Sequence, residues 1–269
     1  MIPAPPRVAF VTGAARGIGA ETVRTLCRQG YQIIAVDSCA GRRADGSEGV
    51  DYPLSSLEDL VRLGGEFPDQ VHTCVADVRD RAALARAAAE GIEKFGRIDA
   101  VVAAAAVIVG GKLLWETPAS DLDMLWDVNV RGVWNTATEC LPHMLQGPDP
   151  SGGRFVAIAS SAGARGLFHL AGYNVAKHAV VGLVKGLAAD LVGTGVTAVA
   201  VSPGATRTAM LDATAALYGV GAVDDFASSQ LIRRLITPGE IAATIAFCCS
   251  IEGAVLNASV VSADGGFTA

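Results

Sequence analysis

Short runs of apolar residues alternate along this chain with longer segments in which apolar positions recur at helical spacing. The short runs are typical of strands buried on both faces, and the longer segments are typical of amphipathic helices that connect parallel strands. This alternation predicts an α/β protein with a doubly wound, mostly parallel sheet of seven strands flanked by helices. The expected strands are Val8–Thr12, Gln32–Val36, Val71–Val75, Ala100–Ala104, Gly153–Ala159, Thr197–Ser202 and Ser259–Ala263, and the expected helices are Gly17–Gln29, Arg81–Phe95, Leu122–Gln146, Gly172–Gly193 and Pro238–Ser250.

One segment, residues 38–69, is longer than a usual connection between a strand and the next helix, and only Leu54–Leu63 within it has a helical pattern. Such length is typical of a functional loop or an insertion. No internal repeat and no linker divides the chain. We therefore expect a single domain over residues 1–269, with an insertion at 38–69 and a substrate lid at 209–236.

The amino-acid composition limits the possible partners. Of the 269 residues, 51% are hydrophobic and 18% are charged, which is too apolar for a disordered chain and indicates that subunits cover part of the surface. We therefore expect a homo-oligomer. The net charge of −6 provides no basic surface for a phosphate backbone, which argues against nucleic-acid binding.

The cysteines and the apolar stretches bear on cellular location. There is no C-x-x-C pair, and the adjacent Cys248 and Cys249 lack the spacing of metal ligands. The segment Met1–Arg7 lacks the features of an export signal, and the longest apolar stretches fall short of the ~20 residues that cross a bilayer. We expect a soluble cytoplasmic protein with no metal site and no membrane partner. Its reduced thiols are expected at Cys27, Cys39, Cys74, Cys140, Cys248 and Cys249.

A glycine-rich segment, residues 12–19 with the sequence TGAARGIG, follows the first expected strand and opens the first expected helix. Backbone N–H groups at such a helix start can bind a pyrophosphate, although glycine-rich turns at this position also serve packing alone. Asp37 ends the next strand, where a carboxylate can accept hydrogen bonds from the adenosine ribose and repel a 2′-phosphate. This favours NAD over NADP. Arg16, Arg42 and Arg43 favour the opposite choice, because a guanidinium can pair with that phosphate.

Tyr173 and Lys177 are four residues apart on an expected helix and therefore project from the same face. A nearby cation can lower the pKa of a tyrosine from its ordinary value of ~10, which would make Tyr173 a usable base. Ser160 ends an expected strand, where its hydroxyl could donate to a substrate oxygen. A tyrosine and a lysine at this spacing alone are more often a surface pair, so the redox interpretation depends on their combination with Ser160 and the glycine-rich segment.

Together these motifs resemble those of the short-chain dehydrogenase/reductase family, and the resemblance covers residues 8–267. It implies a Rossmann-like fold and an enzyme in which Tyr173 is the general base. Ser160 would orient the substrate oxygen, and Lys177 would lower the pKa of the tyrosine and bind the nicotinamide ribose. Asn129 would complete the catalytic set by supporting a proton route through water, with helix packing as its alternative role.

The same resemblance implies the positions that bind the cofactor. Asp77 and Val78 match the family's adenine contact, and residues 203–208 match the turn that receives the nicotinamide carboxamide, with Thr208 as the side-chain donor. The full set of expected cofactor contacts is Gly13, Arg16, Gly17, Ile18, Gly19, Asp37, Ser38, Asp77, Val78, Ala104, Ala106, Tyr173, Lys177, Pro203, Gly204, Thr206 and Thr208.

One departure from the family concerns the turn after the fourth expected strand, where four alanines, residues 103–106, replace Asn-Asn-Ala-Gly. The loss of side-chain hydrogen bonds could loosen the centre of the sheet, and Ala106 places a Cβ where backbone often approaches the cofactor. Main-chain contacts could survive this change.

A finer resemblance links the chain to the mycofactocin-coupled branch of this family, through Val36–Ala40, the long insertion, Tyr52–Ser56 and Ala263–Phe267. This branch implies an NAD held too tightly to exchange, which mycofactocin, a peptide-derived electron carrier, reoxidises. The insertion is well placed to fold over the adenosine half of the cofactor. The alternative is a surface insertion with free exchange of NAD.

The substrate pocket is expected to be lined by residues 107–115, 165–170 and 210–236, whose apolar side chains favour a lipophilic secondary alcohol, terpenoid or alicyclic, or its ketone. An anionic substrate remains an alternative because Arg165 and Arg207 lie in or near these segments. The expected reaction transfers a hydride between the alcohol carbon and NAD. Two alternatives remain, an NADP-dependent carbonyl reductase and a non-catalytic dinucleotide-binding regulator or structural oligomer.

The resemblance also implies a homotetramer. The helices expected at residues 122–146 and 172–193 resemble those that the family pairs across one dimer axis, and the strand expected at 259–263 resembles the second interface. Packing within one chain would produce the same hydrophobicity.

Overall fold

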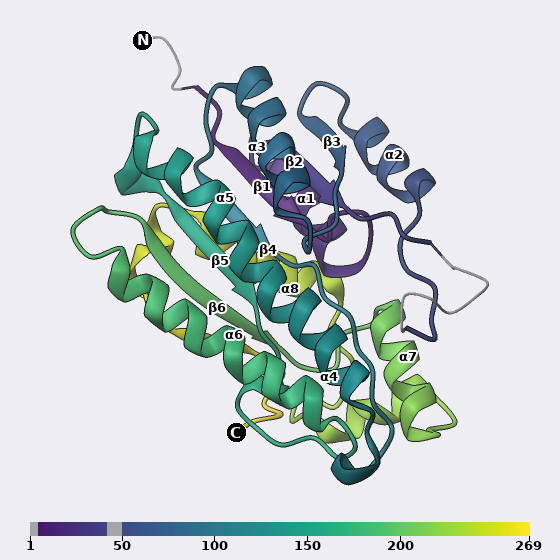
Figure 1. Ribbon diagram of the computed structural model, residues 1–269. Helices are drawn as coiled ribbons and strands as arrows, with labels where there is room; N and C mark the ends of the chain where they lie inside the picture. Colours follow the sequence, from purple (N-terminus) through teal and green to yellow (C-terminus); the bar gives the residue numbers. More distant parts are fainter. Residues whose placement is uncertain (1–4, 42–49) are drawn as a thin grey trace.

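Seven strands form one sheet in the order β3-β2-β1-β4-β5-β6-β7, and every pair of neighbouring strands is parallel (Figure 1). The computed structural model describes residues 5–41 and 50–269. The strand order reverses between β1 and β4, which opens a crevice at the carboxyl ends of these two strands. The strands are β1 (Val8–Thr12), β2 (Gln32–Asp37), β3 (Val71–Val75), β4 (Ala100–Ala103), β5 (Arg154–Ile158), β6 (Thr197–Pro203) and β7 (Val260–Ala263).

Helices cover both faces of the sheet. Figure 1 shows α5 and α6 crossing in front of the strands and α8 behind them. The α-helices are α1 (Gly17–Arg28), α2 (Leu57–Glu66), α3 (Arg81–Phe95), α4 (Ala119–Leu125), α5 (Gly132–Gln146), α6 (Ala171–Asp190), α7 (Ala209–Tyr218) and α8 (Pro238–Cys249). A π-helical turn at Trp126–Arg131 joins α4 to α5, and short 3-10 turns occur at Leu114–Glu116, Pro150–Gly152, Ser161–Gly163, Val223–Ser229 and Glu252–Leu256.

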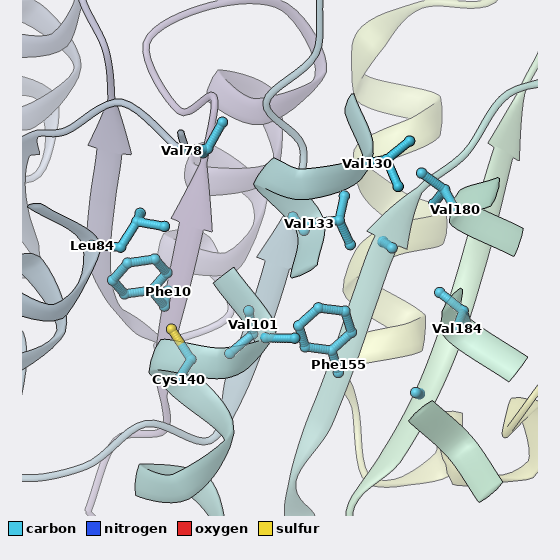
Figure 2. Close-up of a cluster of buried hydrophobic side chains, with 14 of the residues drawn as sticks. Phe10, Val78, Leu84, Val101, Val130, Val133, Cys140, Phe155, Val180 and Val184 are labelled. Carbon is cyan, nitrogen blue, oxygen red and sulfur yellow. The ribbon is translucent and has the colours of Figure 1, made fainter. Parts of the chain in front are cut away.

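The core has two layers because successive strand residues point to opposite faces. Phe10 and Phe155 belong to the layer under α3, α5 and α6, whereas Val11 and Val156 belong to the layer under α1, α2 and α8. Figure 2 shows the first layer, in which Phe10, Val101 and Phe155 lie among side chains of the covering helices. Full burial of each such side chain stabilises the fold by about 1.5–3 kcal/mol.

The predicted fold class is confirmed, and three elements have the predicted bounds: Val8–Thr12, Val71–Val75 and Arg81–Phe95. The helix Arg81–Phe95 begins where the Asp80 carboxylate accepts a hydrogen bond from the Ala83 N–H, 3.1 Å away. It ends at Gly96, whose φ of +82° is readily accessible to glycine. Both signals are visible in the sequence.

Other boundaries differ from the prediction. The helix predicted at Leu122–Gln146 begins at Ala119 and contains the π-helical turn, and the helix predicted at Gly172–Gly193 is Ala171–Asp190. Most remaining ends move by one residue, and Thr197–Ser202 extends to Pro203. No helix in the described part of the chain is both long and apolar enough to cross a membrane.

The insertion holds one helix, α2, at Leu57–Glu66 and not at the predicted Leu54–Leu63. The reason is a reciprocal cap, in which the Ser56 side chain accepts from the Asp59 N–H and the Asp59 side chain accepts from the Ser56 N–H. The prediction also missed α7 inside the expected lid. Arg42, Arg43 and residues 1–4 lie outside the described residues.

Candidate active site

A cleft of about 840 Å³ lies at the carboxyl ends of the strands. Residues from β1, β2, β4, β5 and β6, or from the segments that follow them, line it. Its lining includes Ser160 and all the predicted cofactor contacts, namely Gly13, Arg16, Gly17, Ile18, Gly19, Asp37, Ser38, Asp77, Val78, Ala104, Ala106, Tyr173, Lys177, Pro203, Gly204, Thr206 and Thr208. The fold therefore brings together nearly every residue that the sequence singled out.

The glycine-rich segment turns tightly between β1 and α1. Gly13 has a φ of +65°, and a Cβ there would lie 2.7 Å from backbone atoms of Ala105. A Cβ on Gly19 would lie 2.0 Å from the Gly13 carbonyl oxygen. Arg16 is the residue before α1, and its side chain makes no capping hydrogen bond to the first turn of the helix. That first turn lines the cleft, where its N–H groups can bind a ligand. This arrangement fits an anionic group such as a pyrophosphate.

The turn of alanines at residues 103–106, which begins with the last residue of β4, is held without amide side chains. The Thr12 hydroxyl accepts hydrogen bonds from the N–H groups of Ala104 and Ala105, at 3.2 and 3.3 Å. Ala104, Ala105 and Ala106 all line the cleft. Thr12, at the end of β1, thus holds this turn through its hydroxyl.

Asp37 ends β2 and is fixed from three sides. Its carboxylate accepts hydrogen bonds from the Ala15 N–H at 2.9 Å, the Cys39 N–H at 3.0 Å and the Ser55 hydroxyl at 2.5 Å. Only 5% of the residue is exposed, yet it lines the cleft. Cys39 and Ser55 of the insertion therefore help to hold the carboxylate at the edge where an adenosine ribose would bind.

Residues 50–55 of the insertion bridge the cleft near α1. The Arg16 guanidinium lies 5.8 Å from the centroid of the Tyr52 ring and donates a hydrogen bond to the Pro53 carbonyl. The Tyr52 hydroxyl accepts a hydrogen bond of 3.1 Å from the Ile108 N–H, beyond β4. Arg16 is thus engaged by the insertion, and the sequence offered no signal that Tyr52 would reach Ile108.

Ser160, Tyr173 and Lys177 meet where β5 ends and α6 begins. The hydroxyls of Ser160 and Tyr173 share a hydrogen bond. The Lys177 ammonium donates a hydrogen bond of 2.8 Å to the Ile158 carbonyl and lies 5.7 Å from the centroid of the Tyr173 ring. Tyr173 is 6% exposed and Lys177 2% exposed, so the three side chains form a largely buried group at the wall of the cleft.

The electrostatics of this group differ from the expectation. Burial raises the pKa of Tyr173 to about 12, and the hydrogen bond from Ser160 acts in the opposite direction without overcoming it. Burial also lowers the pKa of Lys177 to about 8. The expected lowering of the tyrosine pKa is therefore wrong for the protein alone, because removal from water disfavours both charged forms.

Asn129 lies behind the cleft and is fully buried in the π-helical turn. Its side-chain oxygen accepts from the Val107 N–H at 2.8 Å, and its side-chain nitrogen donates to the Val107 carbonyl at 2.9 Å. Val107 lines the cleft, whereas Asn129 does not. Through these two hydrogen bonds Asn129 positions Val107, in the segment after β4.

The substrate side of the cleft is mostly apolar, but its walls differ in part from the prediction. Trp115, Leu217 and Leu231 are not among the lining residues. Arg165 lines the cleft and donates a hydrogen bond of 3.0 Å to the Phe267 carbonyl, and Arg207 pairs with Asp224 at 2.5 Å. The apolar lining is formed by Val107, Ile108, Leu167, Phe168, Leu170, Met210, Leu211, Tyr218, Phe226 and Phe267.

Known proteins resemble this chain over nearly its whole length. The family model described as Enoyl-(acyl carrier protein) reductase matches residues 13–268. An uncharacterised NAD-dependent oxidoreductase of Mycobacterium tuberculosis is 34% identical over 268 residues, which cover 97% of this chain and 95% of the relative.

Two solved structures extend the comparison. Carveol dehydrogenase from Mycobacterium avium, in complex with NAD, has a TM-score of 0.89 at 28% identity, with 98% of each chain covered. A short-chain dehydrogenase from Mycobacterium paratuberculosis, bound to NAD, has a TM-score of 0.86 at 29% identity, again with 98% of each chain covered.

Proposed function

This chain belongs to the short-chain dehydrogenase/reductase family, and we propose that it oxidises a lipophilic secondary alcohol, or reduces the corresponding ketone, at the site formed by Ser160, Tyr173 and Lys177. It is an NAD-dependent oxidoreductase. The observation that carries the proposal is that this buried group shares one cleft with the glycine-rich segment and Asp37. A protein that only bound a dinucleotide would have no need for a base beside its substrate pocket.

Each side chain of the group has a task in alcohol oxidation. NAD, when bound, accepts the hydride that leaves the alcohol carbon. Tyr173 takes the hydroxyl proton of the alcohol, and Ser160 donates a hydrogen bond that orients the substrate oxygen. Lys177 lies close enough to Tyr173 to stabilise its phenolate while the ammonium is charged. Asn129 holds Val107 in place at the wall of the cleft.

The contacts of Asp37 and Arg16 support NAD over NADP. The Asp37 carboxylate is fixed at the end of β2, where it would repel a 2′-phosphate. Arg16 is engaged by Tyr52 and Pro53 of the insertion, which leaves it poorly placed to compensate that repulsion. The NADP-dependent carbonyl reductase is therefore the weaker candidate.

We further propose that NAD is held too tightly to exchange and is reoxidised by mycofactocin. The insertion is tied to both sides of the cofactor cleft, through Ser55 on Asp37 and through Tyr52 on Ile108. Both contacts would have to break for the insertion to lift. A segment that is held across a binding cleft in this way slows dissociation of the ligand that it covers.

The apolar lining of the substrate side supports a medium-sized alicyclic or terpenoid alcohol. The relative of known structure from Mycobacterium avium is named for carveol, an alcohol of this kind. Arg207 is paired with Asp224, and the Arg165 guanidinium lies 5.0 Å from the centroid of the Phe267 ring. These contacts favour a neutral substrate over an anionic one.

We also propose a cytoplasmic homotetramer. Large apolar side chains are exposed on the helices expected at one dimer axis, including Trp126 at 41%, Trp134 at 63% and Val175 at 49%. A second exposed group, Phe247 at 50% and Val255 at 82%, lies on α8 and on the turn that precedes β7. Exposed apolar surface of this extent is typical of subunit interfaces.

The function is tested by mixing the purified protein, loaded with NAD, with a series of lipophilic alcohols under single-turnover conditions. The proposal expects nicotinamide reduction by an alicyclic secondary alcohol, and none by the tertiary alcohol of the same skeleton, which has no hydride to transfer. Failure of every secondary alcohol, together with failure of the matching ketones to oxidise NADH, would contradict the proposal.

A further inference from the structure

A second group of chemically reactive side chains lies outside the cleft, between β3 and α3. His72 and Cys74 are two residues apart on β3 and therefore share one face of this edge strand. Glu90, on α3, faces both of them. Imidazole, thiolate and carboxylate are the three kinds of protein ligand that zinc prefers.

The distances within this group are close to those of a zinc site. His72 Nε2 lies 3.4 Å from Glu90 Oε2, and Cys74 Sγ lies 3.7 Å from the same oxygen. All three ligand atoms lie within 4.8 Å of one another. Around a tetrahedral zinc ion, with bonds of about 2.0–2.3 Å, ligand atoms are roughly 3.3–3.6 Å apart. Zinc binding here requires side-chain movement that closes the remaining difference.

We propose that His72, Cys74 and Glu90 bind one zinc ion, with water at the fourth position. Binding displaces the thiol proton of Cys74 to solvent, and the thiolate and the Glu90 carboxylate together balance the charge of the ion. The side chains of His72 and Glu90 are 28% and 56% exposed, so the ion can reach the site from solvent while Cys74 stays buried.

The position of the site gives it a structural consequence. Three residues after Cys74 the chain reaches Asp77, which lines the cleft with Ala76 and Val78. The Ala76 N–H also donates a hydrogen bond of 2.9 Å to the Asp37 carbonyl. Zinc would tie the edge strand to α3 immediately before this segment, and would therefore stabilise the end of the cleft assigned to adenosine.

The spacing of these residues in the sequence does not indicate a metal site, because the ligands do not form a cysteine pair. His72 and Cys74 are separated from Glu90 by 18 and 16 residues, and only the packing of α3 on β3 brings them together. Without a metal, the same contacts are a polar contact between His72 and Glu90 and a hydrogen bond from the Cys74 thiol to Glu90. A metal titration distinguishes these two states.

The test uses the whole protein, stripped of metal with a chelator and titrated with zinc in competition with a chromogenic chelator. The expected result is one zinc ion per chain. Cys74→Ser, His72→Gln and Glu90→Gln should each weaken binding by at least about tenfold, since even the loss of an outer partner of a metal ligand costs 10- to 100-fold. Glu93→Gln and His143→Gln, on α3 and α5, serve as controls and should bind like the wild type.

Cobalt provides a second readout that identifies the ligand. Cobalt bound to the wild type should show a thiolate charge-transfer absorption that is absent in Cys74→Ser and retained in Cys39→Ser. Because Glu90 is more than half exposed, Glu90→Gln is expected to fold and keeps the test decisive if Cys74→Ser does not. No stoichiometric zinc binding by the wild type, or equal affinity in Glu90→Gln, would overturn the proposal.

Discussion

The Lys177 ammonium lies 5.7 Å from the centroid of the Tyr173 ring and is tied to the end of β5 by its hydrogen bond to Ile158. Both side chains are almost fully removed from water, so each resists taking a charge. A phenolate on Tyr173 becomes favourable only while a positive charge stands beside it. Deprotonation of Tyr173 therefore depends on whether Lys177 and the other groups around it carry a positive charge.

This coupling predicts the pH dependence of catalysis. Since burial raises the pKa of Tyr173 to about 12, the phenol is protonated at neutral pH, and its deprotonated fraction increases about tenfold per pH unit. Alcohol oxidation should therefore accelerate with pH up to about 8, where half of the Lys177 side chains have lost their proton, and rise less steeply above that. Ketone reduction uses the protonated phenol and should stay flat near neutral pH. Single-turnover rates in both directions check this, and a flat profile for oxidation would contradict it.

Cofactor choice is predicted to depend on Asp37. Replacement by alanine removes the carboxylate that repels a 2′-phosphate, so the preference for NAD over NADP should fall by about tenfold or more, equivalent to about 1.4 kcal/mol. The same change frees the Ala15 N–H and the Ser55 hydroxyl. Equilibrium binding of both dinucleotides to refolded, cofactor-free protein measures the ratio. Asp59→Ala, which removes a carboxylate that also lines the cleft, is the matched control, and an unchanged ratio in Asp37→Ala would count against the assignment.

The contacts of the insertion across the cleft, from Ser55 to Asp37 and from Tyr52 to Ile108, are predicted to slow the release of NAD. Tyr52→Phe keeps the ring against Arg16 and removes only the hydroxyl that accepts from the Ile108 N–H. NAD release should be faster in this variant, by about fivefold to tenfold for the loss of one hydrogen bond of ~1 kcal/mol or slightly more. Tyr31→Phe, a tyrosine bonded to Arg7 outside the cleft, should release NAD like the wild type.

Exchange is followed by incubating the protein with isotope-labelled NAD and measuring the mass of the retained cofactor. Rapid exchange in the wild type itself would remove the case for a non-exchangeable cofactor and leave an ordinary NAD-dependent dehydrogenase. Equal rates in Tyr52→Phe and the wild type would remove the role of the Tyr52 hydroxyl.

The stability of the protein is predicted to depend on Thr12, whose hydroxyl holds the alanine turn after β4. Thr12→Val keeps the shape of the side chain but leaves the N–H groups of Ala104 and Ala105 without their acceptor. The free energy of unfolding should fall by about 1 kcal/mol or more, as expected when part-buried donors lose a partner. Thr138→Val, at a partly exposed position of α5, should change it by less than about 0.5 kcal/mol. Denaturant unfolding measures both, and equal stabilities would contradict the role of Thr12.

Local sequence was enough to predict the elements whose ends carry their own signals. Arg81–Phe95 has a capping aspartate before it and a glycine after it, and its predicted bounds are confirmed. The α2 helix begins and ends three residues later than predicted, because its start depends on the reciprocal cap of Ser56 and Asp59. The α7 helix was missed because apolar residues occur on all its sides, so the sequence does not show which face is buried.

The candidate site was predictable to the extent that parallel strands bring their carboxyl ends to one edge of the sheet. This rule gathers Gly13, Asp37, Ser160 and the turn after β6 without knowledge of any contact. Tyr52 could not be predicted in this way, because its partner Ile108 is 56 residues away and the contact depends on how the insertion folds back. The direction of the Tyr173 pKa shift in the protein alone could not be predicted for a related reason, since burial is a property of the packed structure and not of spacing.

The most direct test of the account compares Tyr173→Phe with the wild type for two properties, NAD bound per chain and the single-turnover rate of alcohol oxidation, with Tyr31→Phe as the control. The account predicts that Tyr173→Phe retains NAD like the wild type and loses about 100-fold or more of the rate, the usual contribution of a general base. A rate within a few-fold of the wild type, with NAD retained, would show that Tyr173 is not the base and would contradict the central claim.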